Sequence, residues 1–459
     1  MYFFASVMPG RAAALVSFLL VLLALFPPPA QAATGPITKG PWVQRVTTTT
    51  ALVRVEVEPA GPVTLELGLT QTGPADSGER RTIESKEAKT LHSITLTGLQ
   101  PSTRYGLGVH ARGSSKFAAF TTAPPDEGDT PFKFLVYGDN RTDDAAHAAI
   151  VRAMVPVATD FIVNTGDFVA DGASATQWQS FFDIEAPLLR ERCLFSCVGN
   201  HELTDGSGIE YIRYFGATDP KDGGDKKALP EHLDGTFRWG STRFFFLNGM
   251  VSYRDSPDRA WLDRVLAEAD NEKGLVWRIV VVHHGPWSSG PHGNNKRLHE
   301  AGIPAALRAH KIDLVISGHD HIYERGWAEG MGYLVSGGGG APTYRIKEAL
   351  PSAKKYESVR HFIEMSVSPS VLQMTALRAD GSSIERCGLR KEGGWDCDGT
   401  TAPSTSSSNS ATPASTVDGG SSSKCGCRVV GDRRPPWGAA LPLLAIVVLL
   451  VRRRRILAA

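Results

Sequence analysis

The sequence of 459 residues lacks an excess of positive charge outside its two ends. Its formal net charge is +1, yet residues 425–459 hold seven arginines and one aspartate, and residues 1–32 hold one more arginine. Residues 33–424 are therefore net negative, by about six charges. A net acidic region offers no electrostatic footprint for a polyanion, so we exclude nucleic acid as a binding partner.

Cysteine is also scarce, with six residues in the chain. Cys387 and Cys397 flank a loop with turn glycines and could form a local disulfide in an oxidising compartment. Cys193 and Cys197 lie in "RCLFSCVG", which is typical of a buried strand. Residues four apart on a strand are separated by roughly 13 Å, too far for a disulfide, so we expect two buried thiols.

Long apolar runs are confined to the ends of the chain. Residues 1–32 combine Arg11, the run "AAALVSFLLVLLALF" and Ala30-x-Ala32, which predicts a secretory signal peptide cleaved after Ala32. Residues 399–424 are rich in Ser, Thr, Pro and Gly and predict an unfolded linker. Residues 425–459 contain "CGCR", an apolar segment and the cluster Arg452 to Arg455, a strong stop signal for membrane transfer.

This tail resembles the sorting tails of myxobacterial surface proteins. The resemblance implies processing by a sorting protease near Cys425 or Cys427 and display at the cell surface or outer membrane. The alternative is a plain membrane anchor through the same tail. Either way we expect an exported protein attached to a membrane.

Two folded regions are predicted between these ends. Residues 36–123 show short alternating strands separated by turns, as in "ALVRVEVE" and "HSITLTGL", which is typical of an all-β sandwich. Residues 131–398 alternate apolar runs of four to seven residues with helical segments, which predicts an α/β domain.

Polar residues follow the apolar runs of the second region in a fixed order. They are Asp139 in "YGDN", Asp167 in "TGDF", Asn200 and His201 in "VGNHE", His283 and His284 in "VHHGPW", and His319 and His321 in "SGHDH". In open α/β sheets, ligands bind at the carboxyl ends of the strands. Two carboxylates, an amide and at least three imidazoles are ligands suited to two metal ions.

A nucleotide-binding loop is not indicated. The stretch "SGGGGAPTY" at residues 336–344 is rich in glycine, but it lacks the Lys and Ser/Thr of a phosphate-binding loop. We interpret it as a turn that lets the backbone pass close to the metal site.

The order GD, GD, GNHE, HHGP, GHDH resembles the calcineurin-like metallophosphoesterases, and "GHDHIYER" resembles the purple acid phosphatase branch. The resemblance implies a layered β-sandwich core flanked by helices, preceded by a fibronectin type III-like domain. It implies two metal ions (Fe, Zn or Mn), with Asp167 bridging them. Asp139 and His321 would complete one site, and Asn200, His284 and His319 the other. His284 is preferred over His283 because it precedes the Gly285-Pro286 turn.

The resemblance also implies roles in catalysis. His201 would protonate the leaving group or steady the phosphoryl charge in an attack by metal-activated hydroxide. His292 would contact the substrate phosphate; the alternative is a solvated loop histidine. Arg141 would either contact that phosphate or pair with Asp143 or Asp144.

The sequence departs from the family pattern at two positions. The coloured enzymes have a tyrosine where this chain has Ala170, and the broader superfamily often has a histidine where it has Arg141. One metal site therefore lacks a protein ligand, and the purple colour is not expected.

The sequence thus predicts a phosphoric ester hydrolase acting on small monoesters. The rivals are a phosphodiesterase or nucleotide pyrophosphatase on the same metal core, and an inactive extracellular binding protein.

Overall fold

The computed structural model describes residues 36–69, 80–216 and 233–397. The segments interpreted as signal peptide, linker and sorting tail (1–32, 399–424 and 425–459) lie outside these residues. No helix in the described part of the chain has the length and apolarity needed to cross a membrane.

The N-terminal region is built of strands. They are β1 (Ile37–Gln44), β2 (Ala51–Leu69), β3 (Arg81–Leu96), β4 (Arg104–Ala111) and β5 (Ser114–Thr121). The short strand expected from "ALVRVEVE" is the first part of one long strand, β2, because irregular pairing with β3 around Gly61 lets the strand continue beyond it. Its first half pairs with β1 and its second half with β4.

The faces of β2 differ as alternation requires. Val53, Val55 and Val57 point into the apolar core of this region. Arg54 and Glu56 point the other way and contact Arg213, so the polar face is covered by protein rather than by solvent.

The second region contains two seven-stranded sheets. The first has the order β19-β18-β17-β16-β6-β7-β8, with β6, β7 and β8 parallel. Its strands are β6 (Phe132–Tyr137), β7 (Phe161–Asn164), β8 (Cys193–Ser196), β16 (His361–Ser368), β17 (Val371–Arg378), β18 (Ser383–Arg390) and β19 (Gly394–Cys397).

The second sheet has the order β15-β13-β14-β12-β11-β10-β9, with β10, β11, β12 and β14 parallel. Its strands are β9 (Gly235–Trp239), β10 (Thr242–Leu247), β11 (Trp277–Val282), β12 (Leu314–Ser317), β13 (Tyr323–Ala328), β14 (Met331–Ser336) and β15 (Ala353–Glu357).

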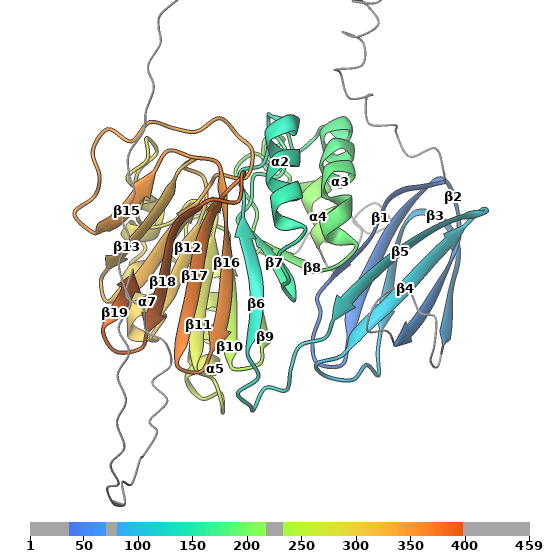
Figure 1. Cartoon of the computed structure of the whole chain (residues 1–459), viewed down its shortest axis with the longest axis horizontal. Coiled ribbons are helices and arrows are strands. Elements are labelled where there is room, and N and C mark those ends of the chain that lie inside the picture. Colours follow the sequence, from blue (N-terminus) through green and yellow to red (C-terminus); the bar gives the residue numbers. More distant parts are fainter. Residues whose placement is uncertain (1–35, 70–79, 217–232, 398–459) are drawn as a thin grey trace, which may run out of the picture. The chain divides into compact units, whose positions relative to one another are not determined.

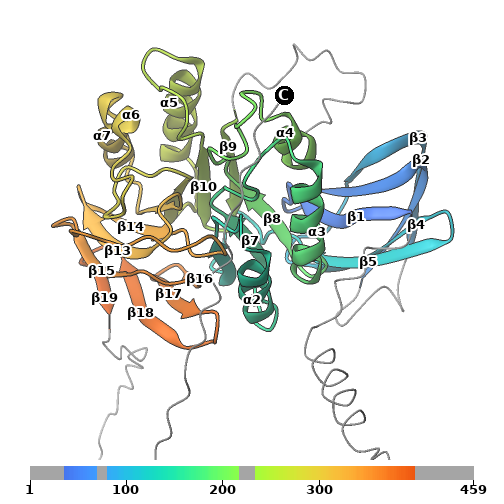
Figure 2. The same ribbon diagram turned by 90° about the horizontal axis from the view of Figure 1, so that it is seen from above.

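The two sheets pack face to face between two layers of helices (Figures 1 and 2). The first sheet carries α2 (Asp144–Met154), α3 (Ala175–Leu189) and α4 (Ile209–Phe215). The second carries α5 (Pro257–Asp270), α6 (Lys296–Glu300) and α7 (Ile303–Ala309). Because the parallel strands are buried on both faces, they appear in the sequence as nearly continuous apolar runs.

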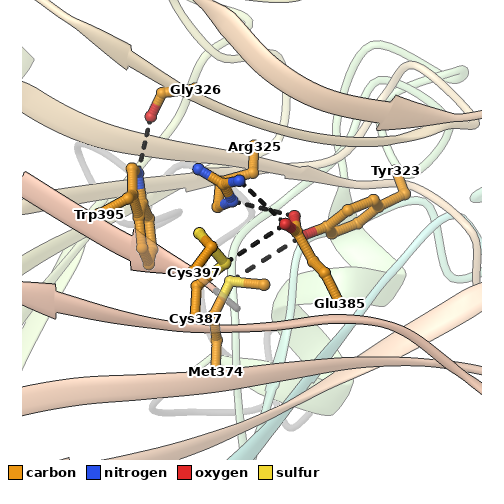
Figure 3. The surroundings of a disulfide bond; sticks show 8 residues. All are labelled: Tyr323, Arg325, Gly326, Met374, Glu385, Cys387, Trp395 and Cys397. Atoms are coloured by element: carbon orange, nitrogen blue, oxygen red, sulfur yellow. Dashed lines mark hydrogen bonds and ion pairs between the residues drawn. A yellow bond between two sulfur atoms is a disulfide. The ribbon is translucent and has the colours of Figure 1, made fainter. Parts of the chain in front are cut away.

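The structure contains a disulfide between Cys387 and Cys397, which face each other across β18 and β19. Figure 3 shows its surroundings: the Glu385 carboxylate accepts hydrogen bonds from Tyr323 and Arg325, and the Trp395 indole donates to the Gly326 carbonyl. Cys193 and Cys197 are buried free thiols.

Candidate metal centre

The strand ends singled out by sequence come together at one edge of the packed sheets. Asp139, Asp167 and Asn200 follow β6, β7 and β8 of the first sheet, and the histidine pairs follow β11 and β12 of the second. The two aspartates and His283 are fully buried, and His321 is 1% exposed. Side chains from both sheets therefore line one buried polar site.

Three residues of this site have left-handed backbone. The φ angles of Asp139, Asp167 and His319 are 56°, 58° and 68°. This conformation is uncommon for residues other than glycine, and costs of order 1–3 kcal/mol each. It turns each side chain away from the strand direction and into the site. Because the backbone of His319 is left-handed, His319 and His321 do not lie on one extended strand, and their rings have different partners.

The neighbouring glycines allow the loops to approach closely. A Cβ atom on Gly318 would lie 2.3 Å from Asp139 Oδ2, and one on Gly199 would lie 2.2 Å from Asp167 Oδ1. A larger residue at either position would displace the carboxylate. The stretch 336–344 also passes close to the site, because a Cβ on Gly337 would lie 3.0 Å from Asp139 Oδ2.

His283 is at the centre of the first cluster of ligand atoms. Its Nε2 lies 3.2 Å from Asp167 Oδ1, 3.1 Å from Asn200 Oδ1 and 3.1 Å from His319 Nδ1. Its Nδ1 lies 2.8 Å from the Thr165 carbonyl oxygen and donates to it, so Nε2 is the nitrogen that can bind a metal once its proton is displaced. One carboxylate, one amide oxygen and two imidazoles suit Zn, Fe or Mn.

His284 is directed elsewhere. Its Nε2 lies 2.9 Å from the Gly293 carbonyl oxygen, and the ring only packs beside that of His319, at 4.3 Å between centroids. The geometry therefore favours His283 over His284 as the ligand and reverses the expectation from sequence. The reason is strand alternation: Val281 faces the inter-sheet core, so His283 does too, whereas Val282 and His284 face the helical side.

A second group of polar atoms surrounds Asp139. Its carboxylate accepts the backbone N–H of His319 at 2.9 Å, and His321 Nε2 lies 3.6 Å from Asp139 Oδ1. Arg141 reaches into the same space, where its Nε donates to Asp167 Oδ2 at 3.1 Å and its Nη2 lies 3.3 Å from His321 Nε2.

Arg141 pairs with neither Asp143 nor Asp144, one of the two alternatives left open by sequence. Asp143 caps α2 and pairs with Arg360, and Asp144 accepts a hydrogen bond from Ser180. Arg141 is therefore a residue of the site.

His201 lies beside the candidate bridging residue. Its backbone N–H donates to Asp167 Oδ1 at 3.1 Å, and its Nδ1 lies 2.7 Å from the Ala170 carbonyl oxygen, to which it donates. Its Nε2 points toward Asp167 Oδ2, 3.9 Å away, and a quarter of the side chain is exposed. This nitrogen can reach a substrate.

His292 lies at the exposed rim of the site. Its ring centroid is 4.3 Å from that of His319, and its backbone N–H donates to Asp320. The sequence analysis missed Tyr344. Its ring stacks on that of His321, with 4.0 Å between the ring centroids, and its centroid lies 5.5 Å from that of His292. Its position at the end of the glycine-rich stretch 336–344 was the available signal.

Sequence reasoning also assigned no role to Glu202, although it is part of the "GNHE" motif. This buried carboxylate accepts the backbone N–H groups of Asp167, Phe168 and Gly199 at 2.8–2.9 Å. It thereby joins the loop after β7 to the loop after β8.

Burial sets the protonation states of the site. Burial, with the charge of Asp167, raises the pKa of Asp139 to about 8. Burial lowers the pKa of His319 to about 2 and of His321 to about 4. Burial would also lower the pKa of His283, but the charges of Asp167 and Asp139 raise it to about 9. Asp167 keeps a pKa below its ordinary value despite burial, because His283, His201 and Arg141 surround it.

Part of the chain that carries this site is similar to a known family. Residues 132–323 match the calcineurin-like phosphoesterase family model. These residues form a calcineurin-like phosphoesterase domain. They contain both aspartates, Asn200 and every histidine of the site, and the family implies a dinuclear metal centre.

Curated proteins similar to this chain include an uncharacterized protein of Mycobacterium tuberculosis, 27% identical over 286 residues (55% of this chain, 53% of the relative). Purple acid phosphatase 7 of Arabidopsis thaliana is 22% identical over 304 residues (57% and 87%). The chain spans about half the length of the first of these relatives.

Solved structures share the fold. The purple acid phosphatase PPD1 from yellow lupin (Lupinus luteus) seeds has a TM-score of 0.65 at 14% identity, covering 78% of this chain and 74% of its own. PhoD has a TM-score of 0.62 at 13% identity, covering 81% and 93%. The two packed sheets and the β-rich N-terminal region of this chain thus share the fold of these two structures.

Metal binding to the phosphoesterase domain is expected to release protons. At pH 7, Asp139 and His283 hold protons because their pKa values are about 8 and 9, and a metal must displace them from these ligands. Isothermal titration of the metal-free protein in buffers of different ionisation enthalpy should show about one to two protons released per chain at pH 7. Release should decrease, and affinity increase, as the pH is raised toward 9. Heats that are independent of the buffer would contradict this expectation.

Replacement of Glu202 is expected to destabilise the phosphoesterase domain. In Glu202→Ala, three buried amides lose their acceptor, which should cost about 3 kcal/mol, since an unsatisfied buried donor costs about 1–3 kcal/mol. Thermal unfolding measures the effect. Glu268→Ala removes an exposed glutamate that forms a surface ion pair with Arg264 and should change stability by about 0.5 kcal/mol or less. Equal midpoints for the two variants would contradict the role assigned to Glu202.

Proposed function

We propose that this protein is a metal-dependent phosphoesterase that hydrolyses phosphate monoesters, in the manner of an acid phosphatase. The observation that carries the proposal is the convergence of Asp167, Asn200, His283 and His319 in a calcineurin-like phosphoesterase domain. This mixture of nitrogen and oxygen atoms suits a divalent or trivalent ion. The neutral state of His319 at pH 7 suits it too, because a metal binds the unprotonated imidazole.

Each residue of the site then has a task. Asn200, His283 and His319 would hold one ion, Asp139 and His321 would face the other, and Asp167 would lie between them. When bound, such ions activate water as a nucleophile and neutralise charge on the phosphoryl group. Glu202 fixes the loops on which these ligands stand.

Two further residues would act on the substrate. The Nε2 of His201 lies 3.9 Å from Asp167 Oδ2, beyond hydrogen-bond distance, and could give a proton to the leaving oxygen. His292, exposed beside His319 and Tyr344, could contact the phosphoryl oxygens.

The test is hydrolysis of p-nitrophenyl phosphate by the full chain, with metal content measured in the same preparation and in an Asn200→Ala/His319→Ala double variant. The proposal expects turnover with bound metal, and loss of both in the variant. Preference for bis(p-nitrophenyl) phosphate or a nucleotide pyrophosphate would favour the rival phosphodiesterase or pyrophosphatase. Bound metal without turnover on any ester would favour an extracellular binding protein.

We also propose, from sequence alone, that the protein is exported and attached to the cell surface through residues 425–459, with the N-terminal region as a fibronectin type III-like accessory domain. The segments that motivate this proposal are the apolar run with Ala30-x-Ala32 and the Cys motif followed by Arg452 to Arg455. Protease treatment of intact cells checks it. A phosphoesterase domain protected until lysis would contradict it.

A further inference from the structure

The two halves of the candidate metal centre differ in how close their ligand atoms lie to one another. In the described ranges 36–69, 80–216 and 233–397, Asp167, His283 and His319 bring ligand atoms within 4.8 Å of one another, whereas Asp139, Asp167 and His321 form no such group. Asp167 thus belongs to a compact half, with His283 and His319, and to an open half, with Asp139 and His321.

Arg141 lies in the open half and donates hydrogen bonds to the lone pairs of its candidate ligands. His321 Nδ1 is 2.7 Å from the Pro342 carbonyl oxygen, which only accepts, so Nδ1 carries the hydrogen and Nε2 offers a lone pair. That lone pair faces Arg141 Nη2 at 3.3 Å, while Asp167 Oδ2 accepts from Arg141 Nε at 3.1 Å. One guanidinium therefore occupies two of the atoms through which a second ion would be held, and leaves the carboxylate of Asp139 as the third.

A guanidinium and a metal ion cannot share this position at low cost. Arginine stays protonated in proteins, and two positive charges a few ångströms apart repel strongly in a buried site. The side chain of Arg141 is only 14% exposed, so water screens the repulsion little.

The guanidinium has space into which it can move. A hollow of about 460 Å³ lies beside it, lined in part by Thr142, Asp144, Ala170 and Gln177. Asp144 offers a carboxylate on the wall of this hollow, and the small side chain of Ala170 takes up little of its space.

We infer that Arg141 stands in for the second metal ion. The protein holds one ion strongly between Asp167, Asn200, His283 and His319, and a second ion binds weakly because it must displace Arg141 toward the hollow. This inference rests on the metal site of the proposed function but not on its hydrolytic activity.

The experiment is a titration of the metal-free full chain with Mn²⁺. Calorimetry measures each binding step, and electron paramagnetic resonance detects coupled ion pairs. The unmodified protein should bind one Mn²⁺ strongly and a second at least about tenfold more weakly, within the usual range of coupling between competing sites. Arg141→Ala should strengthen the second binding step by about tenfold or more and give the coupled signal at lower Mn²⁺.

Two variants keep the result interpretable. Arg360→Ala removes an arginine that pairs with Asp143 nearby but contacts no ligand of the metal centre, so both binding steps should stay unchanged. Arg141→His removes the cation and adds a ligand, so it should bind two ions strongly even if Arg141→Ala folds poorly.

Two ions bound with equal affinity by the unmodified protein would overturn the inference, as would an unchanged second step in both Arg141 variants. Ester hydrolysis in the same samples separates this inference from the proposed function. One strong ion without turnover would support the inference and contradict the hydrolase, and turnover with two equal ions would do the reverse.

Discussion

Replacing His283 by alanine is expected to lower phosphate-ester hydrolysis by about a thousandfold and to release the bound ion. His283 is the buried residue whose Nε2 meets Asp167, Asn200 and His319. A metal contributes several kcal/mol to such a reaction, and each 1.36 kcal/mol is about a factor of ten in rate, so loss of the ion should cost about three powers of ten.

The adjacent histidine provides the matched control. His284→Ala removes the same side chain one residue later, but it breaks only the hydrogen bond to the Gly293 carbonyl, worth about 1 kcal/mol, or a few-fold in activity. Metal content by mass spectrometry and turnover of p-nitrophenyl phosphate measure both variants. The reverse ranking, with His284→Ala losing the ion, would restore the ligand first expected from the sequence.

Replacing His201 by glutamine is expected to lower kcat about a hundredfold or more while leaving the bound metal in place. Its Nδ1 is committed to the Ala170 carbonyl, so Nε2 is the atom available for proton transfer, a role worth about 10²–10⁴-fold. Because His201 is no ligand in this geometry, metal content should match that of the unmodified protein.

The leaving group tests whether the lost rate is proton transfer. p-Nitrophenolate leaves readily without a proton, whereas an alkoxide does not. The loss caused by His201→Gln should therefore be smaller for p-nitrophenyl phosphate than for an alkyl phosphate such as glycerol phosphate. Equal losses for both substrates would assign His201 to phosphate binding instead.

The sequence was most informative where strands end. Apolar runs buried on both faces make the parallel strands visible, and Asp139, Asp167, Asn200 and His319 follow such runs directly. Because these ends meet at one edge of the sheets, the order of the motifs was enough to place these four residues in a common site.

The choice between His283 and His284 needed information that the motif does not carry. The turn containing Pro286 suggested His284, whereas the alternation of Val280 to Val282 between the helical side and the inter-sheet core decides for His283. A continuous apolar run hides which face is which, so only the packing of the second sheet resolves it.

The contacts of Arg141 and Glu202 could not be predicted from the sequence, for a different reason. Arg141 meets His321, which is 180 residues away in the chain, and Glu202 meets the backbone of the loop after β7, about 35 residues away. Such contacts depend on loop conformations, including the left-handed backbone of Asp139 and Asp167, that local pattern does not encode.

The candidate ligands come from two separate sheets, with Asp139, Asp167 and Asn200 after strands of one and His283, His319 and His321 after strands of the other. A bound ion would therefore act as a cross-link between the two halves of the domain, and would favour the state in which the sheets are packed. At a free ion concentration a thousandfold above Kd, this linkage amounts to about 4 kcal/mol of stability. Chelators should then weaken the fold as well as the chemistry, and resistance to heat should follow metal supply.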